Sequence, residues 1–150
     1  MVTTRRRHTL NLLWLSQARS WIRHQIPFLG SIIGGRPEVQ EGRVEGRMDI
    51  DSFTLRLSKN TRAFALKVWG DSMRNAAILK GDIVIMEFRE AKHGDIVEAL
   101  IDGETTLKRF VVQGGMPYLR ASNQKYPDLI PARELVIQGV LIALLRLSKS

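Results

Sequence analysis

The chain has 150 residues, of which 44% are hydrophobic and 25% charged, a composition that suits one globular domain with a single core. It contains no cysteine, which excludes disulfides, thiolate metal sites and a cysteine nucleophile, and which fits a reducing compartment. Most of the net charge of +8 lies in the first 37 residues, which hold six arginines and no acidic residue. Such a basic segment could contact nucleic acid or an acidic protein, or it could be a solvated arm.

The N-terminal part is predicted to contain one amphipathic helix. Apolar residues recur there at intervals of three and four, which predicts a helix over 9–24 that is stopped by Pro27. This stretch is too short and too polar to span a membrane. Residues 26–33 are apolar and bounded by glycines, so we expect an extended segment there. The polar residues 37–46 are expected to form a loop or linker.

From residue 48 onward, short apolar runs between turn signals predict a mostly-β domain. The sequence Asp102-Gly103-Glu104 joins two of these runs and is a hairpin signal. The last run contains Gly139 and many β-branched residues, which favour a long bent strand over a helix. The expected strands cover residues 64–69, 82–88, 96–101, 105–112, 116–121 and 134–147.

The main chemical signal is a serine and a lysine. Ser72 follows a Gly-Asp pair that is typical of a turn, and Lys108 lies in one of the apolar strands. A neutral amine can take the proton of a serine hydroxyl, and burial lowers the pKa of a lysine toward the range where it can do so. Thr106 shares a strand face with Lys108 and could hydrogen-bond the neutral amine. Either residue alone is a weak signal, but together they indicate a Ser-Lys nucleophilic dyad.

The turn before the nucleophile is expected to meet a second requirement of peptide hydrolysis. Gly70 lets the backbone turn, so that the N–H groups of Asp71 and Ser72 can face the oxyanion of a tetrahedral intermediate. Met73 and Trp69 would form an apolar wall that excludes water from this position.

The joint pattern resembles the LexA/UmuD-type family of self-cleaving serine peptidases, which includes LexA repressors, phage repressors and UmuD-type polymerase accessory proteins. The resemblance covers about residues 26–147, and it rests on Gly70-Asp71-Ser72-Met73, Gly81-Asp82-Ile83-Val84, His93-Gly94-Asp95-Ile96-Val97 and Asp102-Gly103-Glu104-Thr105-Thr106-Leu107-Lys108-Arg109. It implies a LexA/signal-peptidase-like β-fold of several small sheets, with Ser72 as the nucleophile and Lys108 as the general base. A loop around 89–93 is one residue shorter than usual, which should disturb neither residue.

The family cuts its own chain at an Ala-Gly or Cys-Gly bond upstream of the serine. The pair Gly34-Gly35 stands where that bond is expected, although glycine in the first position departs from the pattern and the pair could be only a turn. The anchors of the cleavage segment would be Ile32 and Ile33, lying as a strand against the body so that the Gly34 carbonyl reaches Ser72.

The expected organisation is a basic helical arm over 1–25, a cleavage region and linker over 26–47 and a peptidase domain over 48–150. The 33 residues before Gly34 are too few for a DNA-reading helix-turn-helix domain, which favours a UmuD-like layout. The residues around Gly34 nevertheless read closer to a LexA linker. The resemblance therefore implies a UmuD-like accessory of translesion DNA synthesis, a LexA relative without its reader domain, or a gene whose start is wrongly assigned.

The resemblance also implies partners and a cellular setting. We expect a cytoplasmic protein of the SOS DNA-damage response that forms a homodimer through residues 136–147 and is stimulated by a RecA–single-stranded-DNA filament. A translesion polymerase or a full-length repressor are further candidate partners, and direct DNA binding by the arm stays open. The alternative function is a dimerising regulatory module derived from a repressor, with cleavage not its main role.

Two other classes of function find little support. Signal peptidases share a Ser-Met and a lysine, but they usually carry proline at the position of Arg74 together with a membrane anchor. No cofactor or metal is expected, because there is no glycine-rich phosphate loop and His8, His24 and His93 lack metal-ligand spacing. Asp82 is expected to be a turn hydrogen-bonder, as is Asp95.

Overall fold

The computed structural model of the chain describes residues 23–32, 45–51, 55–58 and 60–148. This part is almost entirely β-structure: eight strands hydrogen-bonded in the order β2-β1-β3-β4-β8-β5-β6-β7, and one single-turn 3-10 helix. The predicted mostly-β fold is confirmed. Its strands are joined in one continuous eight-stranded sheet rather than in several separate small sheets. The elements are β1 (Arg23–Ile32), β2 (Gly46–Asp51), β3 (Ala63–Val68), η1 (Arg74–Ala76), β4 (Ile83–Glu87), β5 (Ile96–Ile101), β6 (Glu104–Gln113), β7 (Met116–Arg120) and β8 (Leu135–Leu145).

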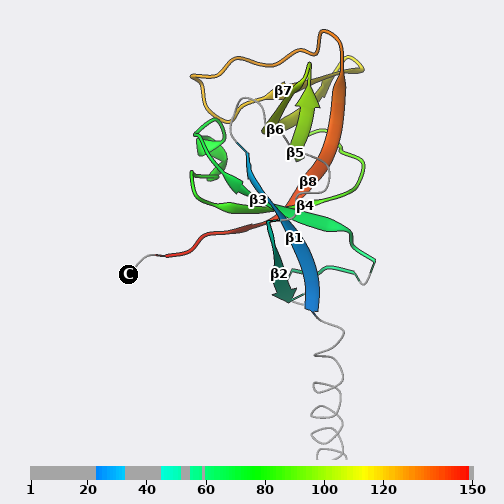
Figure 1. Cartoon of the computed structure of the whole chain (residues 1–150). Helices are drawn as coiled ribbons and strands as arrows, with labels where there is room; N and C mark the ends of the chain where they lie inside the picture. The colour runs from blue at the N-terminus through cyan, green and yellow to red at the C-terminus, as the bar shows by residue number, and fades with distance from the viewer. Residues whose placement is uncertain (1–22, 33–44, 52–54, 59, 149–150) are drawn as a thin grey trace, which may run out of the picture.

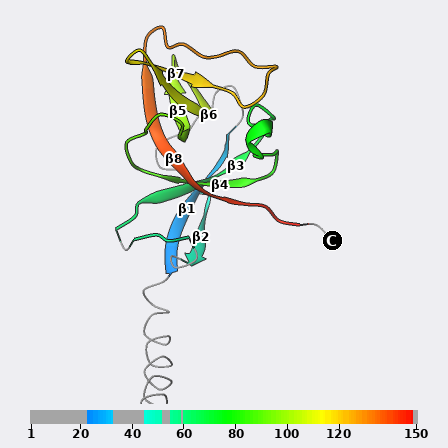
Figure 2. The ribbon, with the colours of Figure 1, turned by 180° about the vertical axis from the view of Figure 1, so that it is seen from behind.

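The joint between the two halves of the sheet is β8. Residues 135–140 of this strand pair with β5, residues 140–145 pair with β4, and both pairings contain a register shift. The strand is therefore long and bent, as expected, and it runs from the part formed by β5, β6 and β7 to the part formed by β1 to β4 (Figures 1 and 2). The bend includes Gly139, where an added Cβ would lie 2.8 Å from both the Phe64 ring and the Met86 Cβ.

The first strand lies inside the sheet. It is antiparallel to β2 and parallel to β3, and Ile26 is completely buried in a cluster with Ile50, Ala63, Ala65 and Ile85. The extended segment expected over 26–33 is thus confirmed as far as Ile32. The helix expected over 9–24 lies mostly outside the described residues, but its predicted end was wrong. The backbone of residues 23 and 24 pairs with β2, because tertiary strand pairing overrides a local helical pattern.

The strands from β3 to β8 begin and end within two residues of their predicted bounds. The hairpin between β5 and β6 turns through Asp102 at φ 47° and Gly103 at φ 85°. Two consecutive positive φ angles are the signature of the two-residue turn that the Asp-Gly pair predicted. The short edge strand β2 and the helix η1 were not predicted, and most of the expected loop over 37–46 lies outside the described residues.

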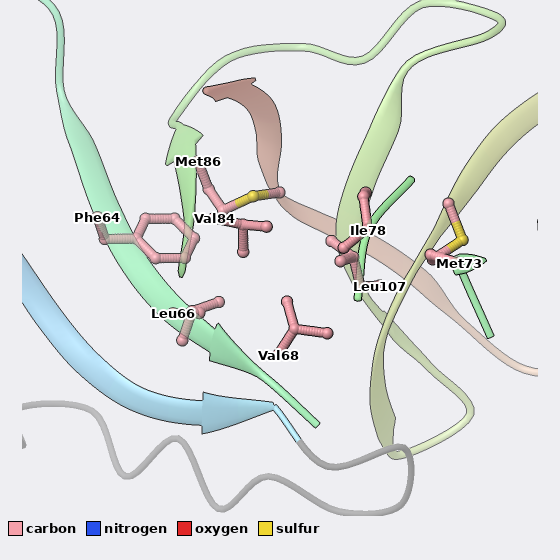
Figure 3. Close-up of a cluster of buried hydrophobic side chains, with 8 residues drawn as sticks. All are labelled: Phe64, Leu66, Val68, Met73, Ile78, Val84, Met86 and Leu107. Carbon is pink, nitrogen blue, oxygen red and sulfur yellow. The ribbon is translucent and has the colours of Figure 1, made fainter. Parts of the chain in front are cut away.

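A hydrophobic cluster includes Met73, the residue that follows the predicted nucleophile. Three successive inward side chains of β3 meet residues of β4 and β6 there, and Met73 and Ile78 complete the cluster from the segment between β3 and β4 (Figure 3). Met73 is 3% exposed, so the residue that follows Ser72 is anchored in the core. The full set is Phe64, Leu66, Val68, Met73, Ile78, Val84, Met86 and Leu107. No helix within the described ranges is long and apolar enough to cross a membrane.

Candidate active site

The structure brings Ser72 and Lys108 together. Ser72 lies on the turn that follows β3, and Lys108 projects from the middle of β6. The Lys108 Nζ lies 2.9 Å from the Ser72 Oγ, although the two residues are 36 positions apart. The serine turn begins at Gly70, whose φ of 102° is a backbone conformation that favours glycine. An added Cβ at Gly70 would meet nothing within 4 Å, so the requirement for glycine here is conformational rather than steric.

The surroundings of Lys108 favour the neutral amine. The residue is 6% exposed, and burial lowers its pKa from 10.5 to about 8. Its Nζ donates to the Thr106 Oγ1 at 2.6 Å, as predicted, and to the Leu107 carbonyl oxygen at 3.2 Å. A neutral amine has two N–H groups and one lone pair. With the two N–H groups directed to these oxygens, the lone pair is left to accept the Ser72 hydroxyl proton.

The backbone of the turn leaves two donors available. Among the described residues, no acceptor meets the N–H of Asp71 or of Ser72. The Asp71 carbonyl oxygen, by contrast, accepts the N–H of Arg74 at 3.1 Å and a side-chain donor from a distant loop. The two N–H groups proposed for an oxyanion are therefore not used within the described part of the fold.

A cavity of about 320 Å³ opens beside the serine. Its walls come from the serine turn, from the β5–β6 hairpin with the following part of β6, and from the loop between β7 and β8. Met73, which is buried, and Trp69, with 41% of its surface exposed, are both among the residues that line it. The two residues predicted to shield the nucleophile thus line this cavity together.

The loop between β7 and β8 also contacts the serine turn, which the sequence did not predict. The Asn123 Nδ2 donates to the Asp71 carbonyl oxygen at 2.9 Å, and the Tyr126 hydroxyl donates to the Asp71 carboxylate. The N–H of Asn75 donates to the Ser122 carbonyl oxygen at 2.7 Å. The only signal for these residues in the sequence was a polar stretch typical of a loop.

The two aspartates predicted as turn hydrogen-bonders have that role. Asp82 accepts the N–H of Leu79 at 2.7 Å, and Asp95 accepts the N–H of Lys92 at 2.8 Å. Asp82 also forms a two-pronged ion pair with Arg146, which lowers the pKa of this carboxyl, and this pair was not predicted. No group of side chains in the described part of the chain is arranged to hold a metal ion.

The predicted cleavage segment is described only up to its first anchor. The backbone of Ile32 ends β1 in register with Val68 at the end of β3. Ile33, Gly34 and Gly35 lie outside the described residues. The beginning of this segment is therefore located next to the strand that leads into Ser72, and the rest of the prediction is untested.

The protein is thus a mostly-β protein whose fold places a serine hydroxyl beside a buried lysine amine. Residues 27–142 match the Peptidase S24-like family, so the chain belongs to this family, as the LexA/UmuD-type resemblance indicated. It is 52% identical over 121 residues to a LexA repressor of Verrucomicrobium spinosum, covering 81% of this chain and 60% of the relative.

Two further relatives agree with this assignment. A LexA repressor of Opitutus terrae is 42% identical over 126 residues, which cover 83% of this chain and 63% of the relative. A LexA repressor of Mycobacterium leprae is 40% identical over 122 residues, which cover 81% of this chain and 50% of the relative. The chain thus spans between half and two thirds of the length of these relatives.

Proposed function

We propose that the protein is a self-cleaving serine peptidase in which Ser72 attacks the Gly34-Gly35 bond and Lys108 is the general base. The observation that carries the proposal is the 2.9 Å contact between the serine hydroxyl and a buried amine whose pKa is lowered to about 8. Membership of the Peptidase S24-like family supports the same reading.

The reaction follows from the contacts of the two residues. The neutral Lys108 Nζ removes the hydroxyl proton while the Ser72 Oγ bonds to the Gly34 carbonyl carbon, which produces an oxyanion. The N–H groups of Asp71 and Ser72 stabilise that charge. The intermediate collapses as Lys108 returns the proton to the departing nitrogen of Gly35. Water then hydrolyses the acyl-serine ester, with the amine again acting as base.

The strand arrangement supports cleavage within one chain. The parallel strands β1 and β3 finish at the same end of the sheet, where Ile32 lies beside Val68. Gly34 follows Ile32 by two residues, which is about 7 Å of extended chain. The proposed bond is thus tethered near the cavity, and such a tether replaces a bimolecular encounter with an intramolecular one.

The proposed setting is the SOS response to DNA damage. The named relatives are LexA repressors, which supports a regulatory output. A RecA–single-stranded-DNA filament would act by favouring two minority states, the docked cleavage segment and the neutral lysine. The output is either UmuD-like, licensing a translesion polymerase, or LexA-like, acting with a full-length repressor.

Mass spectrometry after incubation at alkaline pH tests the activity. At pH about 10 we expect wild-type protein to yield a fragment that begins at Gly35, because the amine is then neutral. The cleavage rate should rise with pH through a midpoint near 8, the pKa of Lys108. Ser72→Ala removes the nucleophile and should stay whole at every pH. Equal cleavage of the two proteins would mean that another group or a contaminating protease does the cutting.

The repressor names of the relatives also favour a second reading, a dimerising regulatory module. The apolar strand β8 is the proposed contact, and Val136 and Leu147 near its ends are 46% and 84% exposed. Sedimentation at micromolar concentration should show a homodimer for both wild-type and Ser72→Ala protein. A monomer at that concentration would contradict the dimer and leave the peptidase proposal standing.

A further inference from the structure

We propose that Asn123 and Tyr126 are positioning residues that hold the Asp71–Ser72 peptide with its N–H directed toward the substrate cavity. This inference deepens the proposed function and rests on it. The two residues lie on the loop between β7 and β8, and both reach Asp71, from positions 52 and 55 residues further along the chain.

The contact of Asn123 fixes the orientation of one peptide plane. Its Nδ2 donates to the Asp71 carbonyl oxygen at 2.9 Å, while its Oδ1 accepts the N–H of Lys125 at 3.1 Å. The second bond settles which end of the amide faces the turn. In a planar trans peptide, the C=O of one residue and the N–H of the next point in opposite directions. Holding the Asp71 carbonyl oxygen against Asn123, which does not line the cavity, therefore directs the Ser72 N–H away from Asn123.

Tyr126 and Ser122 secure the same turn at two more points. The Tyr126 hydroxyl donates to the Asp71 carboxylate, and the Ser122 carbonyl oxygen accepts the N–H of Asn75 at 2.7 Å. The serine turn is thus held at its backbone, at its side chain and at the helix that follows it. In both views of the ribbon the β7–β8 loop lies beside the segment that contains η1 (Figures 1 and 2).

The loop is itself fastened, so it can act as a fixed support. Leu129 forms a two-way bridge to Leu119 of β7, with N–H to carbonyl oxygen distances of 3.0 and 2.8 Å. Further along, the Asp102 carboxylate accepts the backbone N–H groups of residues 132, 133 and 134 at 2.7 to 3.0 Å. The part of the loop that follows Pro127 is therefore anchored at two places.

The serine turn needs such a support because core packing holds Val68 and Met73 on either side of it but not the residues between them. Met73 is held in the core, but nothing lies within 4 Å of an added Cβ at Gly70. Glycine allows several backbone conformations at this point. Rotation of the Asp71–Ser72 peptide would turn a carbonyl oxygen toward the oxyanion in place of an N–H. The hydrogen bonds from Asn123 and Tyr126 oppose that rotation.

The test compares three variants at pH about 10. Asn123→Leu keeps the approximate size of the side chain but removes the donor, and it should lower the plateau cleavage rate about tenfold or more. The pH midpoint of the rate should not move, because Asn123 does not contact Lys108. Tyr126→Phe removes only the side-chain bond and should give a smaller loss. Gln124→Ala, at an exposed neighbouring position, should cleave as the wild type does.

A second measurement separates this inference from the proposed function. At neutral pH, the ¹⁵N and ¹H shifts of the Asp71 and Ser72 amides should change in Asn123→Leu and stay unchanged in Gln124→Ala. Wild-type rates and shifts in Asn123→Leu would overturn the positioning role, as would a loss caused only by a shifted pH midpoint. Wild-type protein that stays intact while the shifts move would overturn the peptidase instead. If Asn123→Leu does not fold, the Tyr126→Phe rate and shifts decide in the same way.

Discussion

Burial makes Lys108 a usable base without making its amine neutral in every molecule. Burial disfavours the ammonium and so lowers the pKa of the amine to about 8, which is still above neutral pH. At pH 7 roughly one molecule in ten then carries the neutral amine. The hydroxyl of Ser72 is consequently unactivated in most molecules at rest, which is a built-in restraint on a proposed self-cutting protein.

Glu98 is a second buried ionisable group, and the proposed reaction does not use it. It is 2% exposed on β5, and its Oε2 meets no hydrogen-bond partner within the described residues. Its register partners are Leu107 on β6 and Gly139 on β8, neither of which offers a side-chain donor. Desolvation raises the pKa of this carboxyl from 4.5 to about 7. The folded protein is therefore more stable with Glu98 protonated than with Glu98 ionised.

Replacing this carboxyl should change how stability depends on pH. Between pH 4.5 and 7 the unfolded chain loses the Glu98 proton while the folded chain keeps it, so the free energy of unfolding falls as pH rises. Glu98→Gln cannot ionise, and relative to wild type it should gain up to about 3 kcal/mol on going from pH 5 to pH 8. Denaturant titrations at both pH values measure this. Glu104→Gln on the exposed hairpin is the control, and a gain equal to that of the control would refute the role of burial.

The contact of Lys108 with Thr106 was predictable from strand alternation, and the pairing of Ser72 with Lys108, 36 positions apart, was predictable only from the joint pattern that resembles the family. The turn comes from three adjacent residues, and strand alternation places the threonine beside the lysine. The contacts of Asn123, Tyr126 and Arg146 were not predictable. They join residues 52, 55 and 64 positions apart, and they depend on the path of a loop and of the C-terminal segment, which no local periodicity encodes.

At the scale of the elements, β8 holds the sheet together through a residue without a side chain. Gly139 is buried at the bend, and the Phe64 ring and Met86 Cβ both approach the position that a Cβ would occupy to 2.8 Å. A methyl group there must displace a core ring or push β8 away from β4.

We therefore expect Gly139→Ala to lower the free energy of unfolding by about 1–3 kcal/mol through overpacking. Gly46→Ala in β2 is a matched strand control, because an added Cβ at that position meets nothing within 4 Å. Thermal unfolding followed by circular dichroism measures both variants. Equal midpoints for the two would show that β8 accommodates the methyl group without strain.

Sequence patterns located the strands well where apolar runs are long and bounded by turns, as in β5, β6 and β8. They failed at the other edge of the fold. β2 buries a single residue, Ile50, and so leaves a weak signal. The end of the predicted helix was misplaced because residues 23 and 24 pair with β2 as part of β1. The spacing of neighbouring apolar residues does not reveal a long-range pairing of this kind.

At the scale of the whole molecule, the proposed cut and the sheet topology have to be considered together. A break after Gly34 would separate residues 1–34 from the rest, yet β1 pairs with both β2 and β3. Ile26 is completely buried in the core cluster of that region. Breaking one peptide bond removes none of these contacts.

The N-terminal fragment should therefore stay bound after cleavage. Native mass spectrometry of protein cut at pH about 10 and returned to neutral pH should show both pieces in one complex, and a denaturing gel should show them apart. Ile26→Ala creates a cavity in the core cluster and should speed the separation. Two free pieces under native conditions in the wild type would mean that β1 leaves the sheet as soon as the bond is cut.

Retention bears on the charge of the product. The fragment carries five arginines and no acidic residue, so its loss removes five of the eight net positive charges. The nicked complex keeps that charge, and its salt-dependent DNA binding should match that of the intact chain until the fragment is gone.

Because an inner strand precedes the proposed scissile bond, release of the N-terminal fragment would lag behind cleavage. The proposed reaction would be complete once the ester is hydrolysed, but the fragment would leave only when the ten residues of β1 separate from β2 and β3. Residues remote from Ser72 can lengthen or shorten that interval without altering the reaction. The delay between cleavage and release of the fragment would then depend on packing around Ile26 rather than on catalysis.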